Sequence, residues 1–255
     1  MGDLAMTREN YKRELQSIQG EILKMGSLVE KQIHQAVRYL SNQDLVGAQS
    51  VLDNDDIVDQ MQIDIEEHCM SMIALQQPVA SDLRTIVAIL KITTDVERIG
   101  DHACNIAELT LRIGEEQLIK PLNDIPRMAR KTEAMVRDSL TAFVKRDLVL
   151  AEKVRQADEP VDEMYSLLFD ELIGLILQGS EGRRAGQAIN LLFAARYLER
   201  IADHATNVAE RVMYMVTGHR VDHMSTGPGT PHGVDADAFE AVIDRASGST
   251  RYLDS

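Results

Sequence analysis

The chain has 255 residues, a net charge of −14 and a pI of about 4.9. This acidic surplus argues against a nucleic-acid-binding protein and against broad binding to an anionic membrane, because both need clustered Lys and Arg. The charged start of the chain, and the lack of an apolar run near the ~20 residues that span a bilayer, predict a cytoplasmic protein. Cys69 and Cys104 have no metal-type or disulfide-type spacing and are expected to be buried.

Six amphipathic stretches predict an all-α fold of long helices. In the first stretch, apolar residues such as Leu15, Ile18, Ile22 and Met25 recur at three- and four-residue spacing, the period of a helix with one buried face. Short connections between long helices favour antiparallel neighbours. The expected helices cover about 7–41, 44–77, 81–115, 125–145, 147–178 and 183–217.

Two blocks of the sequence repeat at nearly the same offset. Residues 44–61 match 147–164 at nine of 18 positions, and residues 97–108 (ERIGDHACNIAE) match 199–210 (ERIADHATNVAE) at nine of 12. Such repetition indicates a duplicated structural unit. We therefore expect two tandem, pseudo-symmetric, antiparallel three-helix bundles, the first over 1–120 and the second over 121–218. Residues 219–255 predict a disordered acidic tail with one short helix near 236–245.

Each repeat carries an ExxxD motif on its last predicted helix. Glu97 and Asp101 are one helical turn apart in the first repeat, and Glu199 and Asp203 have the same spacing in the second. Residues four apart lie on the same face of a helix. Earlier in both helices this face carries apolar residues, so a core-type stripe becomes acidic at the motif.

An aspartate on the second helix of each unit is expected to join the motif. A hairpin turn near residue 79 places Asp59 level with the first motif, and a turn near residue 180 places Asp162 level with the second. Each of these residues has another aspartate one turn before it, Asp55 and Asp158. The predicted metal-site residues are therefore Glu97, Asp101, Glu199, Asp203, Asp59 and Asp162.

Carboxylates crowded along one stripe repel one another and lose solvation, and a bound cation offsets both costs. All-oxygen sites suit divalent or ferric ions, so Fe, Mn, Mg and Zn are the candidates. A solvated acidic face is the simpler alternative. A carboxylate-bridged metalloenzyme (an oxidase or phosphatase) and a metal-free helical adaptor are two others. None of the seven His follows a Glu by three residues, as ferritin-like di-iron sites require, and we expect no enzyme.

Neighbours of the motifs have structural roles in the simplest interpretation. His102 and His204 follow the motif aspartates but lie to one side of the acidic stripe, so we expect them to pack or hydrogen-bond inside the bundle. Arg98 and Arg200 are expected to pair with nearby carboxylates.

The repeated motifs, and the longer segment QPVASDLRTIVAILKITTDVERIGDHACNIAE, resemble the signature of the PhoU family over about residues 7–220. In that family two three-helix bundles carry E/DxxxD motifs that bind metal in some members, and Glu97, Asp101, Glu199 and Asp203 match those positions. Asn105 and Asn207 match the Asn that follows.

The resemblance to the PhoU family implies a cytoplasmic negative regulator of phosphate uptake and of the phosphate-starvation response. It also implies a homodimer whose partners are subunits of a phosphate ABC transporter and a sensor histidine kinase. Membrane association would then be peripheral and mediated by these partners, and no nucleic acid would bind.

Overall fold

The computed structural model describes residues 2–178 and 182–219, and within these ranges the chain forms helices and no strand. The predicted tail beyond His219 lies outside the described residues. The all-α prediction is confirmed. The helices are α1 (Gly2–Asn42), α2 (Leu45–Leu52), α3 (Asp55–Gln76), α4 (Ser81–Ile113), α5 (Asp124–Lys145), α6 (Leu148–Gln156), α7 (Glu159–Leu177) and α8 (Gly182–Thr217).

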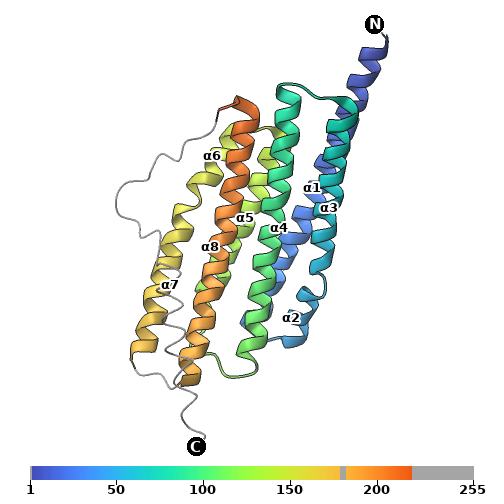
Figure 1. The fold of residues 1–255 in the computed structure, drawn as a ribbon. Coiled ribbons are helices and arrows are strands. Elements are labelled where there is room, and N and C mark those ends of the chain that lie inside the picture. Colours follow the sequence, from blue (N-terminus) through green and yellow to red (C-terminus); the bar gives the residue numbers. More distant parts are fainter. Residues whose placement is uncertain (1, 179–181, 220–255) are drawn as a thin grey trace, which may run out of the picture.

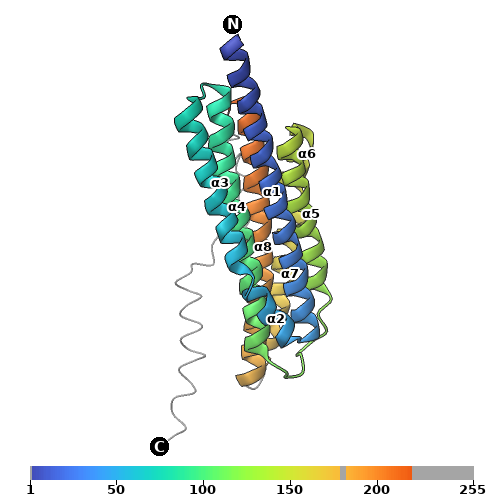
Figure 2. The same ribbon diagram turned by 90° about the vertical axis from the view of Figure 1, so that its right-hand side faces the viewer.

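The two repeats pack as tandem bundles around a shared centre (Figures 1 and 2). Helices α4 and α8 run antiparallel at the centre and pack against each other more extensively than any other pair in the described chain. Helices α1 and α5 lie side by side and form a second layer against them. Helix α3 flanks α1 and α4, and α7 flanks α8. The predicted pair of helical bundles is thus confirmed.

The prediction of six unbroken helices was wrong at two equivalent places. The second predicted helix is interrupted at 53–54, where the side-chain amide of Asn54 donates a hydrogen bond to the backbone carbonyl of Ser50. The fifth is interrupted at 157–158, directly before Pro160 in the first turn of α7. A proline inside a helix removes a backbone hydrogen bond and clashes with the preceding turn, so it favours a new helix start.

The same local devices begin α2 and α6. Gln43 and Arg146, 103 residues apart, adopt positive φ angles of 52° after α1 and α5. The following aspartates, Asp44 and Asp147, then accept hydrogen bonds from backbone amides in the first turn of α2 and α6. Such N-caps satisfy amides that have no partner within the helix. The repeat therefore extends from sequence to helix-capping geometry.

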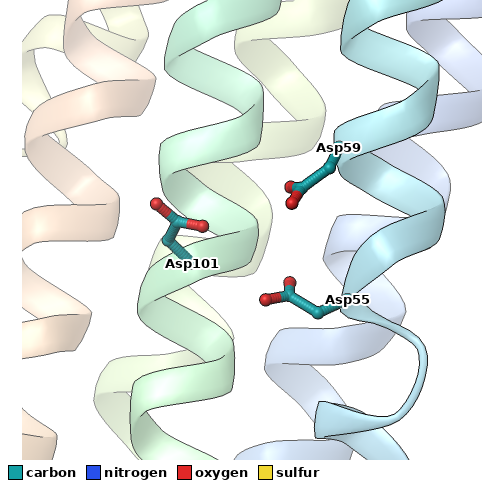
Figure 3. A group of neighbouring side chains, drawn as sticks. All are labelled: Asp55, Asp59 and Asp101. Atoms are coloured by element: carbon teal, nitrogen blue, oxygen red, sulfur yellow. The ribbon is translucent and has the colours of Figure 1, made fainter.

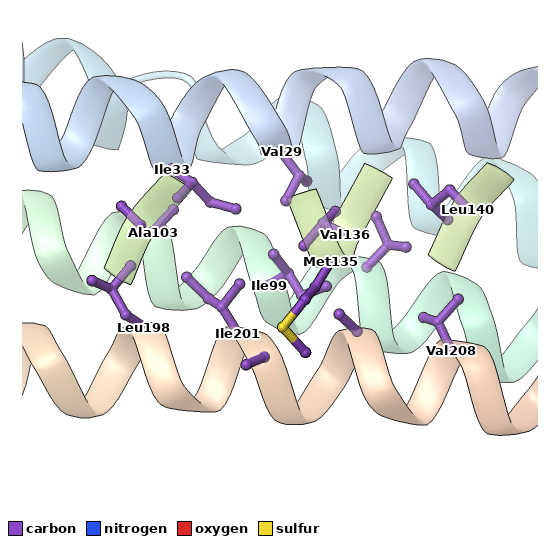
Figure 4. Packing of buried hydrophobic residues seen from close by; sticks show 14 of the residues in the cluster. Val29, Ile33, Ile99, Ala103, Met135, Val136, Leu140, Leu198, Ile201 and Val208 are labelled. Atoms are coloured by element: carbon purple, nitrogen blue, oxygen red, sulfur yellow. The ribbon is translucent and has the colours of Figure 1, made fainter. Parts of the chain in front are cut away.

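The core lies between α1, α4, α5 and α8 (Figure 4). Burial of each large aliphatic side chain stabilises the fold by about 1.5–3 kcal/mol. At one close contact, a Cβ on Gly26 of α1 would lie 2.1 Å from Cδ1 of Leu140 on α5, so the absence of a side chain permits this approach. Members of the core labelled in the figure are Val29, Ile33, Ile99, Ala103, Met135, Val136, Leu140, Leu198, Ile201 and Val208.

None of the helices in the described ranges combines the length and the apolar character of a membrane-spanning segment.

Candidate metal centre

Three aspartates from two helices converge in the first repeat (Figure 3). Asp55 and Asp59 belong to α3 and Asp101 belongs to α4, and each offers a carboxylate oxygen within 4.8 Å of those of the other two. We call these three residues the aspartate cluster. Asp59 is exposed, whereas Asp55 and Asp101 are partly buried, so the cluster opens to solvent on one side.

The break between α2 and α3 positions the cluster. Asp55 is the first residue of α3, where the helix dipole and free backbone amides favour a carboxylate. Asp59 follows one turn later. The hairpin between α3 and α4 then brings Asp101 level with both, as the fold-back argument from sequence predicted for Asp59.

Glu97 borders the aspartate cluster on α4. Burial, followed by the nearby charge of Asp101, raises its pKa to about 6, although Arg98 opposes the shift. Arg98 contacts Asp101 at 3.0 Å and Glu97 at 3.5 Å, which confirms its predicted pairing. A single half-exposed arginine therefore faces several carboxylates, and the local charge remains strongly negative.

Asp59 and Asp101 also have raised pKa values. Burial and the charge of Asp55 are the largest causes of the raised pKa of Asp59. For Asp101, the effect of burial on the pKa exceeds the opposing effect of Arg98. Asp55 is held from the other side by the Cys104 thiol, which donates a hydrogen bond at 3.1 Å. Cys69 and Cys104 are both buried, as predicted.

In the second repeat, the motif glutamate Glu199 lies deeper than its counterpart Glu97, whereas Asp203 is more exposed than Asp101. Glu199 on α8 is only 8% exposed, and burial and the charge of Asp203 raise its pKa to about 7. Asp158, at the start of α7, also has its pKa raised to about 7, by burial and by Asp162. One buried oxygen of Glu199 and one of Asp158 lack a hydrogen-bond partner. Arg196 pairs with Glu199, and Arg200 lies 3.7 Å from Asp203, as predicted for Arg200.

The two repeats differ in how tightly they gather their acids. Within 2–178 and 182–219, three potential ligand residues come within 4.8 Å of one another only at the aspartate cluster. The structure thus brings the predicted residues Asp59 and Asp101 together, with Glu97 beside them. In the second repeat Asp162, Glu199 and Asp203 influence one another electrostatically without forming such a group.

The donor set of the first repeat fits a hard cation. All of its ligands are oxygens, which divalent and ferric ions prefer. A bound ion would also relieve the repulsion between the carboxylates and lower their raised pKa values. Asp55, Asp59 and Asp101 are the residues positioned to hold the ion, and Glu97 is next to them. Asp55 was absent from the residues predicted for the site, although its four-residue spacing from Asp59 was the available signal.

The motif histidines face the seam between α4 and α8 instead. His204 Nδ1 lies 3.0 Å from Asp95, and Asn207 donates to the same carboxylate oxygen at 3.4 Å. His102 stacks on Tyr197, and burial together with nearby His204 lowers its pKa to about 4. These contacts agree with the structural role expected for both histidines.

Comparison with known proteins gives a consistent family. The PhoU domain model matches residues 22–110 and 125–212. A PhoU homologue of the phosphate-specific transport system from Clostridium acetobutylicum is 40% identical over 218 residues, covering 85% of this chain and 99% of the relative. One from Aquifex aeolicus is 42% identical over 211 residues, covering 83% of this chain and 95% of the relative.

Solved structures agree with these matches. The crystal structure of PhoU from Pseudomonas aeruginosa has a TM-score of 0.78 and 38% identity, and covers 82% of this chain and 100% of that protein. The structure of the phosphate transport system regulatory protein PhoU from Streptococcus pneumoniae has a TM-score of 0.77 and 32% identity, with coverage of 83% and 99%. The chain therefore belongs to the PhoU family.

Proposed function

We propose that this chain is a cytoplasmic, non-enzymatic accessory regulator that restrains phosphate uptake and the phosphate-starvation response. The observation that carries the proposal is the aspartate cluster, formed where a repeated motif meets a helix break in a chain of the PhoU family. Relatives are named as accessory proteins of the phosphate-specific transport system, which supports this role.

In this proposal the cluster binds a divalent or ferric ion (Fe, Mn, Mg or Zn), and Glu199, Asp203 and Asp162 form a second site. The ion supplies positive charge between helices whose acids otherwise repel one another. The chain's own contribution is to fix α3 against α4 through Asp55, Asp59 and Asp101. Raised carboxylate pKa values and one arginine facing the first-repeat acids support this reading.

Regulation then occurs through protein contact. The chain acts as a homodimer on subunits of a phosphate ABC transporter and on a sensor histidine kinase, and reaches the membrane through them. With metal bound, the α3–α4 hairpin would present a defined surface to a partner. Without metal, repulsion among Asp55, Asp59 and Asp101 would loosen the hairpin. The family relationship supports these partners, and size measurement of the purified chain would test the dimer.

A replacement experiment in the source bacterium tests the proposal. The chromosomal copy is deleted, or replaced by the Asp55→Asn/Asp101→Asn variant or by the control Asp64→Asn/Glu67→Gln. The control residues are exposed acids on α3 outside the cluster. Phosphate uptake and a starvation-responsive reporter are then measured in phosphate-rich medium.

Deletion should raise both signals, the cluster variant should raise them comparably, and the control should leave them low. Unchanged uptake and reporter activity after deletion would remove the regulatory proposal. Derepression by deletion but not by the cluster variant would keep the regulator and remove the functional role of the metal site.

A further inference from the structure

The exposed surface of α5 is basic although the protein is acidic. All five exposed residues of this helix are Arg or Lys: Arg127, Arg130, Lys131, Arg137 and Lys145. The next residue, Arg146, is exposed as well, and its guanidinium donates a hydrogen bond to Thr85 of α4 at 3.2 Å. In a chain with a net charge of −14, this concentration of cations on one helix indicates a segregated charge distribution.

Helix α1 continues the basic surface. Between Ile22 and Asn42 its exposed residues include Lys24, Lys31 and Arg38 and no acid. The seven-residue spacing of these three cations places them along one face of the helix.

The two helices present their cations at matching levels. Arg137 of α5 bonds Glu30 of α1 at 2.7 Å, and Glu133 lies 3.5 Å from His34. These pairs fix an antiparallel register in which Arg38 lies level with the start of α5 and Lys24 with its end. Figure 2 shows α1 and α5 side by side. We call the surface formed by Lys24, Lys31, Arg38, Arg127, Arg130, Lys131, Arg137, Lys145 and Arg146 the basic face.

The acids within these stretches leave the basic face with an excess of cations. Glu30 pairs with Arg137 of the face itself, and Glu133 has a side-chain exposure of only 15%. Asp124 lies 3.4 Å from Lys120, and Asp138 lies 3.4 Å from Lys153 of α6. Among the described residues, Lys31 and Lys131 have no ion-pair partner. Lys31 belongs to the α1 half of the basic face and Lys131 to the α5 half.

We propose that the basic face also binds an anionic lipid surface directly, in addition to the membrane contact made through protein partners. Juxtaposed Lys and Arg attract anionic lipids by about 1 kcal/mol each, and the attraction acts within a Debye length of about 8 Å. Helices α3 and α4, which carry the aspartate cluster, pack directly against α1, and helix axes in contact are about 8–10 Å apart, about one Debye length. The repulsion from the cluster is therefore partly screened at the basic face, so the total charge alone does not decide membrane binding.

The chemistry of the face favours lipid headgroups over a protein partner. Protein interfaces centre on buried apolar and aromatic anchors. On the described face between Ile22 and Asn42 and along α5, Leu23 is the one exposed large apolar side chain. A broad, flexible array of Lys and Arg suits mobile phosphate headgroups better than it suits the apolar anchors of a protein partner. This inference is independent of the proposed metal site.

Flotation of the full chain with vesicles tests the proposal. Vesicles contain phosphatidylcholine alone or phosphatidylcholine with phosphatidylglycerol, in low salt and in 0.5 M NaCl. The test variant is Lys31→Gln/Lys131→Gln. The control, Lys91→Gln/Arg112→Gln, removes two exposed cations from α4 and changes the net charge equally. Thermal melts establish that both variants remain folded.

The chain should float with the anionic vesicles only, and high salt should release it. The test variant should bind about 30-fold more weakly, and the control should bind like the original chain. No flotation at low salt, or equal weakening in the control, would overturn the proposal. Binding of duplex RNA or DNA through the same two lysines, without vesicle binding, would replace lipid by nucleic acid and overturn it too.

Discussion

Asp95 of α4 and His204 of α8 join the two repeats, with Oδ1 and Nδ1 3.0 Å apart. The offset of 102 that aligns the motifs maps Asp95 to residue 197 (95 + 102) and His204 to residue 102 (204 − 102). These positions hold Tyr197 and His102, whose rings stack at 5.7 Å. A polar pair on one side of the seam therefore corresponds to a ring pair on the other, and the duplicated helices pack asymmetrically.

Replacing Asp95 should weaken the α4–α8 seam. Asp95→Ala removes the acceptor of His204 and Asn207 in a partly buried place, and we expect the free energy of unfolding to fall by about 1–3 kcal/mol. Asp95→Asn keeps one acceptor oxygen and should cost less. Urea unfolding followed by circular dichroism measures both, and equal losses in the two variants would argue against the hydrogen-bonding role.

The close contact of α1 and α5 predicts opposite effects for two glycine substitutions. Gly20 has open space around it, so Gly20→Ala should stabilise the helix by about 1 kcal/mol. In Gly26→Ala the new methyl group meets Leu140, and overpacking costs about 1–3 kcal/mol. We expect Gly26→Ala to be less stable than Gly20→Ala by at least about 1 kcal/mol in thermal or urea unfolding, and comparable stabilities would refute the close packing.

The second repeat predicts an unusual dependence of stability on pH. Burial and Asp203 raise the pKa of Glu199 from 4.5 to about 7, so the folded state binds more protons than the unfolded state between these values. The contribution of Glu199 to stability therefore falls as pH rises through this window. Glu199→Gln should raise the free energy of unfolding at pH 8 by about 2 kcal/mol, and by progressively less toward pH 4.

Metal-free protein should be used for this pH comparison, because a cation near Glu199 would oppose the shift. The exposed Glu67→Gln substitution on α3 serves as the control. A constant difference between Glu199→Gln and the original chain from pH 4 to pH 8 would contradict the raised pKa as its cause.

Much of the fold was predictable because the internal repeat and the helical spacing of apolar residues are both visible in the sequence. The buried face of α4, including Ile92, Val96 and Ile99, follows this period throughout. The breaks at 53–54 and 157–158 were missed because the apolar pattern continues across both. Pro160 and the run of polar residues at 53–56 were the local signals for a new helix start.

The candidate site was predictable only in part for a related reason. Four-residue spacing identified Glu97 and Asp101, and the hairpin argument identified Asp59. Whether Asp55 or Glu97 completes a tight group depends on where α3 begins and on side-chain directions, which helical spacing alone does not determine. The basic face was not predicted, because net charge conceals how charges divide between the helices.

Metal content tests the central claim most directly. The purified full chain and an Asp55→Asn/Asp59→Asn/Asp101→Asn variant of confirmed helicity are incubated with Fe, Mn, Mg or Zn, freed of unbound ions and analysed by mass spectrometry. The exposed pair Asp64→Asn/Glu67→Gln is the control. We predict bound metal in the original chain and the control, and a clear loss in the cluster variant. Equal metal content in all three proteins, or none in any, would contradict the aspartate cluster as a metal site.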